Sequence, residues 1–168
     1  MNNTPARKSS ENPGYLIRRL QQLSSSNFMS SLRDFQLTPI QYTMLRVLEE
    51  SPGIDQRTVA SLAALDTSTT TDVLRRLAGR KLVSRTPGPT DKRTRIIRLT
   101  KSGQKLLETV RPMVDDARRE LLAPLSSAKQ QALIASIVAL IDAHEHKYED
   151  KEDAPPDGPV GRPWKRLK

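Results

Sequence analysis

Threonine, serine and arginine side chains gather in the middle of the chain, and their chemistry is that of phosphate and base binding. Residues 67–71 read T-S-T-T-T and are followed by Arg75 and Arg76, and a second basic run occupies residues 92–98. Hydroxyl and guanidinium groups hydrogen-bond to the phosphates and to the base edges of nucleic acids. Threonines near a helix start also serve as caps, and exposed arginines as plain solvated surface, so both interpretations stay open.

The position of the charge favours the binding interpretation. Residues 75–105 hold eleven lysines and arginines against a single acid, Asp91, whereas the rest of the chain has 17 basic and 18 acidic residues. This one stretch therefore carries the whole net charge of +9. A local excess of this kind indicates a polyanionic partner, although charge alone does not separate DNA from RNA or an anionic membrane.

Other kinds of chemistry find little support in the sequence. The chain has no cysteine, which excludes disulfides, thiolate zinc sites and thiol redox switches. His144 and His146 lie two residues apart on a predicted helix and face different directions, so we predict no metal site. No paired carboxylates, nucleophile elbow or phosphate-binding glycine loop is present, and we predict no cofactor and no enzymatic activity. With no long apolar run and no signal peptide, we expect a cytoplasmic protein without membrane contact.

The elements that must position these side chains follow from hydrophobic spacing and from capping residues. The capping box at Thr38 and the aspartates at 55 and 66 mark three helix starts. We predict helices at about 15–35, 38–50, 55–64, 66–80, 100–122 and 127–148, and a hairpin of strands 82–86 and 94–100 around a Pro/Gly-rich turn. Residues 1–13 and 149–168 read as disordered tails that flank one domain at 14–148. The predicted fold class is mainly α with a small β-hairpin.

The helix that follows Asp66 has one apolar side, formed by Val73, Leu74 and Leu77. On a helix that turns about 100° per residue, Ser68, Thr71, Asp72 and Arg75 then point outward. Hydroxyls followed by an arginine are unusual for a plain solvent face. They suit a helix that reads a DNA groove.

In its order of elements and in three segments the chain resembles the MarR family of bacterial regulators. The segments are LTPIQYTMLRVLEESPG (37–53), VASLAALDTSTTTDVLRRLAGRKLV (59–83) and PTDKRTRIIRLTKSGQKLL (89–107). The resemblance implies a winged helix-turn-helix lobe at about 37–100 and dimerisation helices at about 15–35 and 101–148. It also implies a homodimer whose recognition helices enter successive major grooves of double-stranded DNA while each wing enters the minor groove.

The resemblance and the outward-facing side chains together select the candidate DNA contacts. They are Thr67, Ser68, Thr69, Thr71, Arg75, Asp91, Arg93 and Arg95. Arg75 suits a phosphate or a guanine edge. Asp91 and Arg93 match the family's D-x-R element, in which the acid orients the arginine, although the pair could be only a surface turn. Where this chain has Gly88, the family often has an acidic residue, and where it has Lys81, the family often has a glycine. Gly79 could explain the second difference as a shifted helix end.

Similarity to the family further implies an effector, commonly a small aromatic acid bound beside the dimerisation helices. The candidate ligand-binding residues are Tyr15, Arg18, Gln22, Met29, Tyr42 and Met44. An arginine would bind the carboxylate and apolar side chains the ring, but the same residues could be ordinary core and surface. The start PGYLIRRLQQ is similar to regulators of aromatic and nicotinate-type catabolism.

The sequence therefore predicts a sequence-specific transcriptional regulator, in the first instance a repressor that a small aromatic carboxylate releases from a pseudo-palindromic operator. A non-specific basic protein that coats DNA or RNA is the alternative. A small-molecule-binding enzyme is a third possibility, which the missing catalytic groups disfavour.

Overall fold

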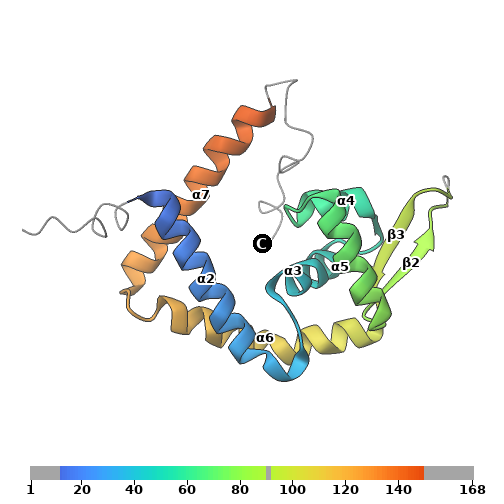
Figure 1. Ribbon diagram of the computed structural model, residues 1–168, viewed down its shortest axis with the longest axis horizontal. Helices are drawn as coiled ribbons and strands as arrows, with labels where there is room; N and C mark the ends of the chain where they lie inside the picture. Colours follow the sequence, from blue (N-terminus) through green and yellow to red (C-terminus); the bar gives the residue numbers. More distant parts are fainter. Residues whose placement is uncertain (1–11, 90–91, 150–168) are drawn as a thin grey trace, which may run out of the picture. The chain divides into compact units, whose positions relative to one another are not determined.

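The computed structural model describes residues 12–89 and 92–149, and side chains as far as His144 (Figure 1). These residues form six α-helices, a short 3-10 helix and three strands, in agreement with the predicted fold class. The chain forms two compact units, each built from two segments. The first unit consists of the chain up to Pro39 together with Val110–Pro124, and the second consists of Ile40–Thr109 together with the chain from Leu125 onward. Both predicted tails fall almost wholly outside the described residues.

Helix α2 (Pro13–Ser31) begins two residues before the predicted start because Asn12 caps it. The Asn12 side-chain oxygen accepts a hydrogen bond from the Tyr15 amide at 3.2 Å. The helix also ends earlier than predicted. The 3-10 helix η1 (Arg33–Phe35) follows it and leads to Gln36, whose φ of 47° is left-handed. The predicted continuous helix to Phe35 is therefore wrong in its last turn, where the chain changes direction between the buried Leu32 and Leu37.

Helices α3 (Pro39–Glu50), α4 (Gln56–Leu62) and α5 (Thr67–Gly79) form the helical part of the second unit. The predicted cap of α4 is confirmed: Asp55 Oδ1 accepts from the amides of Arg57 and Thr58 at 2.9 and 3.0 Å. Together with strands and the start of α6, these helices enclose an apolar core. Its members in this unit include Met44, Leu45, Leu48, Val59, Leu74, Leu77, Ile97 and Leu107, all 0% exposed.

Helices α4 and α5 end in the same way, with a left-handed residue that is not glycine. Ala64 has φ 52° and Lys81 has φ 59°. At the second site the Leu82 amide donates to the Leu77 carbonyl and the Lys81 amide to the Ala78 carbonyl, which is the Schellman pattern. The left-handed position is thus Lys81 itself, and Gly79 does not replace the missing family glycine. A side chain at a left-handed residue costs free energy, so both helix ends carry local strain.

The hairpin prediction is confirmed, and the sheet has one strand more than expected. Strands β2 (Val83–Pro87) and β3 (Arg95–Leu99) pair antiparallel with Val83 opposite Leu99 and Arg85 opposite Ile97. The two-residue strand β1 (Ile54–Asp55) adds to the other side of β3, so the order is β1-β3-β2. This places the start of α4 directly beside the wing strands.

Helices α6 (Lys101–Leu122) and α7 (Ser127–Glu149) complete the chain close to their predicted bounds. Thr100 caps α6 as expected, since its Oγ1 accepts from the Gly103 amide at 3.1 Å and donates to the Lys81 carbonyl at 2.7 Å. Gly103 has no room for a side chain, because a Cβ there would lie 2.2 Å from the Leu82 carbonyl oxygen. The glycine therefore lets α6 start against the end of the α5 segment.

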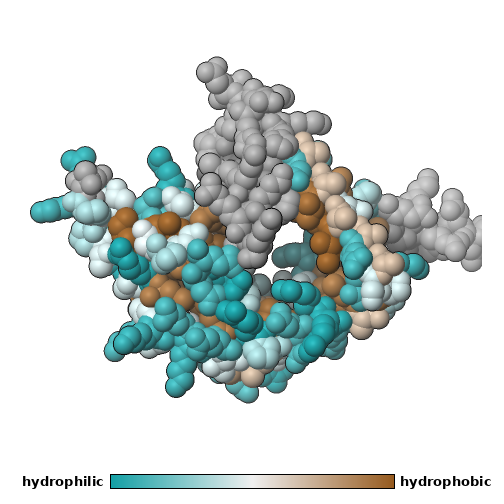
Figure 2. Space-filling model, turned by 180° about the vertical axis from the view of Figure 1, so that it is seen from behind, coloured by the Kyte–Doolittle hydropathy of each residue, from teal (hydrophilic) through white to brown (hydrophobic). Residues whose placement is uncertain are grey.

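Two helices expose more apolar surface than a helix at a protein surface usually does. The large exposed residues on α2 are Tyr15, Leu16, Ile17, Leu20, Leu23 and Met29, and those on α7 are Ile134, Ile137, Leu140 and Ile141. Hydrophobic surface, drawn brown, is open to solvent among hydrophilic residues in Figure 2. None of the helices in residues 12–89 and 92–149 has both the length and the hydropathy needed to span a lipid bilayer.

Candidate nucleic-acid interface

The start of α5 is held by a closed set of hydrogen bonds. Asp66 Oδ1 accepts from the Thr69 amide at 2.7 Å, and Asp66 Oδ2 accepts from Thr69 Oγ1 at 2.6 Å. The bonds from the Thr69 hydroxyl and amide stabilise the carboxylate and lower the pKa of Asp66 below its ordinary value. Thr69 therefore belongs to the cap, and its hydroxyl hydrogen is committed to Asp66.

Burial fixes which side of α5 faces outward. Thr70, Leu74 and Leu77 are 0% exposed, whereas Ser68, Thr71 and Arg75 are exposed. The facing predicted from hydrophobic spacing is therefore confirmed for these residues, whereas Val73, predicted on the inner side, and Asp72, predicted on the outer side, are both half-buried. One polar atom lies on the inner side: Thr70 Oγ1 is buried and has no hydrogen-bond partner among the described residues.

The outward hydroxyl of Thr71 is linked to two other elements through Gln56, the first residue of α4. Gln56 Nε2 donates to Thr71 Oγ1 at 2.6 Å, and Gln56 Oε1 accepts from Arg85 Nη2 on β2 at 3.1 Å. Thr71 Oγ1 in turn donates to the Thr67 carbonyl at 2.8 Å. One side chain thus connects α4, α5 and the wing. Gln56 and Arg85 are not among the residues predicted from the sequence, because their contacts join residues 15 and 29 positions apart.

The arginines of α5 share one acidic partner. Arg75 Nη2 lies 2.6 Å from Asp72 Oδ1, and Arg76 Nη2 lies 3.1 Å from Asp72 Oδ2. The hydrogen bond and the charge of Arg75 lower the pKa of Asp72, and the same pair raises the pKa of Arg75. Both guanidinium groups remain open to solvent, with side chains 69% and 64% exposed. A polyanion can therefore reach them without any movement of the backbone.

The wing adds cations to this surface. Arg85 on β2, Arg95 and Arg98 on β3, and Lys92 and Arg93 beside the turn are all exposed. The Arg98 guanidinium lies over the left-handed Gly53, where a Cβ would come within 3.1 Å of Nη2. Asp91 falls outside the described residues, so its predicted pairing with Arg93 stays a prediction.

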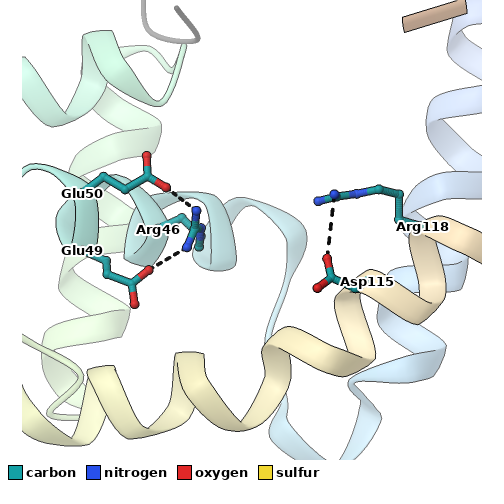
Figure 3. Close-up of polar contacts among 5 residues, drawn as sticks. All are labelled: Arg46, Glu49, Glu50, Asp115 and Arg118. Carbon is teal, nitrogen blue, oxygen red and sulfur yellow. Dashed lines mark hydrogen bonds and ion pairs between the residues drawn. The ribbon is translucent and has the colours of Figure 1, made fainter. Parts of the chain in front are cut away.

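Three arginines on other helices form ion pairs about one helical turn away, Arg46 on α3 and Arg118 and Arg119 on α6. On α3, Arg46 contacts Glu49 at 2.7 Å and also Glu50, and on α6 Arg118 lies 3.7 Å from Asp115 (Figure 3). Each of these arginines has at least one acidic neighbour of its own. On α5, by contrast, Asp72 serves two arginines, so the α5 surface keeps an excess of positive charge.

The first unit contains an open pocket of about 930 Å³ along α2 and η1. Gln22 and Met29 line it, as do Arg33 and the serines at 25 and 26. Ser25, Ser26 and Arg33 are not among the ligand-binding residues predicted from the sequence. Arg33 was missed because the helix was predicted to continue through it, and serines inside a helix give no binding signal by themselves.

The other predicted ligand residues lie elsewhere. Tyr15 and Arg18 are neighbours on α2, with the guanidinium carbon 6.0 Å from the ring centre, but they do not line the pocket. Tyr42 and Met44 are on α3, and Met44 is 0% exposed within the core. Among the described residues, no group of three or more histidines or carboxylates could hold a metal ion.

Comparison with known proteins connects this geometry to a family. Residues 37–94 match the model of the MarR family. The repressor NicR of Pseudomonas putida is 30% identical over 87% of this chain and 92% of its own length. A second relative, the transcriptional regulator HosA of Escherichia coli, is 32% identical over 76% of this chain and 93% of its own.

Among solved structures, Bordetella bronchiseptica BpsR superposes with a TM-score of 0.75 and 28% identity, over 79% of this chain and 95% of that one. That structure is described as showing how 6-hydroxynicotinic acid regulates the DNA binding of BpsR. The repressor CouR, solved on a 23-mer DNA duplex, superposes with a TM-score of 0.74 and 28% identity, over 84% of this chain and 99% of that one. Both helical units of the fold and the wing thus recur in DNA-binding proteins of known structure.

Proposed function

Since this chain belongs to the MarR family, we propose that it is a sequence-specific DNA-binding transcriptional regulator that places α5 in the major groove and its wing in the minor groove. The observation that carries this proposal is the outward face of α5. Ser68, Thr71 and Arg75 stand exposed on it while Leu74 and Leu77 are buried beneath.

The physical chemistry of this face suits a DNA backbone and base edges. Free amides and the dipole at a helix start attract phosphate, and hydroxyl and guanidinium groups reach base edges. Cations on β2 and β3 extend the positive surface toward the wing tip, where an arginine such as Arg93 would favour a narrow minor groove. The DNA complex of CouR supports this docking by similarity.

We further propose that the protein works as a homodimer joined by α2 and α7. These helices expose ten large apolar side chains, which a single chain leaves in water. A two-fold dimer carries two α5 helices and two wings, which predicts half-sites about one helical turn apart. As a regulator of bacterial DNA it would act in the cytoplasm and would need no catalytic activity.

The proposed effector is a small aromatic carboxylate, of the kind that acts on BpsR. In this chain the pocket of the first unit supplies Arg33 for a carboxylate, Gln22 for a polar ring substituent and Met29 for the ring. The relative NicR is a repressor, which supports repression, and the regulation of BpsR by 6-hydroxynicotinic acid supports control of that repression by such a ligand.

The test is a binding titration with the DNA upstream of the gene itself and with a random duplex of equal length. A specific regulator should prefer its operator by about 10³-fold or more, and an aromatic acid should weaken that complex. A steep salt dependence without any preference would instead identify the alternative function, a non-specific basic DNA- or RNA-binding protein. Arg93→Ala should weaken operator binding strongly, whereas Arg118→Ala on α6 is the matched control.

A further inference from the structure

We infer that Gln56 is a positioning residue that holds the outward hydroxyl of Thr71, whose hydrogen is bound to the Thr67 carbonyl, so that one lone pair is left to accept from a base, and so sets which bases α5 prefers. This inference rests on the proposed DNA-reading role of α5. It concerns the polarity of one hydroxyl group, which the family resemblance does not define. Three contacts carry it.

The first contact removes the hydrogen of Thr71. Its Oγ1 donates to the Thr67 carbonyl at 2.8 Å, within the same helix. A hydroxyl has one hydrogen and two lone pairs. Once that hydrogen is used, Thr71 can only accept.

The second contact removes one of the two lone pairs. Gln56 Nε2 donates to Thr71 Oγ1 at 2.6 Å from the start of α4. One lone pair and the methyl group of the exposed Thr71 then remain for a ligand.

The third contact fixes the amide of Gln56 in this orientation. A glutamine amide can usually be turned over without a visible change, so its orientation follows from its partners. Here Arg85 Nη2 lies 3.1 Å from Gln56 Oε1, and an arginine can only donate. A reversed amide would set its NH₂ group against the guanidinium. Arg85 therefore orients Gln56, and Gln56 orients Thr71.

The consequence for DNA reading is specific. In the major groove the hydrogen-bond donors are the amino groups of cytosine and adenine, whereas guanine and thymine oxygens and all phosphate oxygens are acceptors. A Thr71 oxygen that can only accept matches the amino groups and gains nothing from a phosphate. Its methyl group can also contact a thymine methyl, but not by a hydrogen bond. Thr71 would thus contribute to base preference and not to general affinity.

The decisive variant is Gln56→Met in the full-length protein. A methionine of similar length has no N–H group to donate to Thr71, so Thr71 keeps its bond to the Thr67 carbonyl but loses the donor that holds its oxygen. Thr71→Val removes the hydroxyl at almost constant shape. Thr109→Val on α6, whose exposed hydroxyl likewise donates to the carbonyl four residues earlier, serves as the control for a lost exposed hydroxyl. Thermal unfolding checks that each variant folds.

The measurement uses a randomised duplex pool from which the wild type selects its preferred sequence, followed by titrations of every single-base variant of that sequence. We expect Gln56→Met and Thr71→Val to reduce the preference at the same base position by on the order of tenfold. Gln56→Met adds no charge and should leave the preference at the other positions unchanged. In the Thr71→Val background, Gln56→Met should no longer alter the base profile.

Failure of the proposed function and failure of the positioning role of Gln56 give different results. If the wild type selects no sequence at all, the proposed function fails. If it does select one but Thr71→Val or Gln56→Met leaves the base profile as it was, the function stands and the positioning role of Gln56 is overturned. Loss of preference at two different positions would overturn it as well, because the two residues would then act separately.

Discussion

Replacing Arg75 by alanine decides whether this arginine touches the DNA backbone or reads a base. The sequence allows both, and the structure leaves the guanidinium 69% exposed with Asp72 as its neighbour at 2.6 Å. A contact to phosphate releases counterions, so its loss changes the salt dependence of binding. A contact to guanine carries sequence information, so its loss changes the base preference.

The expected magnitude follows from the two copies of Arg75 in the proposed dimer. Each phosphate contact contributes about 0.9 to the slope of log Kobs against log salt concentration, so Arg75→Ala should flatten that slope by about 1.8. Between about 50 and 200 mM salt, wild-type binding should then weaken about twelvefold more than binding by the variant. If Arg75 instead reads guanine, the slope should change little while discrimination at that position falls by about 5- to 150-fold in each half-site.

The assay is fluorescence anisotropy with the selected operator, with operators changed at single bases and with a random duplex, each at several salt concentrations. Asp72→Asn is the matched variant. It frees both arginines and removes a negative charge from the surface, so it should tighten binding to operator and random duplexes alike. If Arg75→Ala leaves both the salt slope and the base profile unchanged, Arg75 lies outside the interface and the orientation proposed for α5 is refuted.

Further predictions concern the scaffold that holds this face. Thr70→Val removes the buried hydroxyl without a partner and should raise the free energy of unfolding in urea by about 1 kcal/mol, whereas Thr70→Ser should lower it. Lys81→Gly removes the side chain from a left-handed backbone position and should raise the free energy of unfolding by up to about 1 kcal/mol. A lower free energy of unfolding would show that Lys81 is not strained. Gly103→Ala brings a Cβ against the Leu82 carbonyl and should lower the thermal midpoint by the equivalent of about 2 kcal/mol or more. Because the folded pKa of Asp66 is lowered, its stabilising effect is complete above the ordinary value of 3.8 and is lost as pH falls through the folded pKa. Asp66→Asn, which keeps a cap, should therefore flatten the acid limb of stability against pH.

Much of the fold could be predicted because its signals are local. Asp55 and Asp66 each cap a helix with their own side chain, and their place before an apolar run is visible in the sequence. Strand β1 was missed because two residues show no alternation, and it exists only through its pairing with β3. The left-handed ends at Ala64 and Lys81 were also unpredictable, since only glycine gives a sequence signal for that conformation.

The candidate site was likewise predictable only where its signals are local. The outward face of α5 follows from the spacing of Leu74 and Leu77, and the structure agrees. The contacts of Gln56 with Thr71 and Arg85 depend on how three elements meet, and no pattern within one element reports it. Arg33 was not selected from the sequence for a related reason, since the turn that brings Arg33 to the pocket interrupts a helix that hydrophobic spacing had continued.

The hydrogen bonds within α5 also limit what the two tests on Arg75 and Thr71 can find together. These residues are four positions apart, so they lie one above the other on the same face. Thr71 offers only an acceptor and Arg75 only donors. If Arg75 reads a base, α5 therefore matches an amino-bearing base next to a guanine. Arg75→Ala and Thr71→Val must then each lose base preference, at two neighbouring positions of the operator. If Arg75 holds a phosphate, its loss must flatten the salt slope while the single preference set by Thr71 persists. If Arg75→Ala both flattened the salt slope and lost the preference at the base position assigned to Thr71, the result would contradict both arrangements. An arginine bound to the DNA backbone has no means of orienting a hydroxyl that Gln56 and Thr67 already hold.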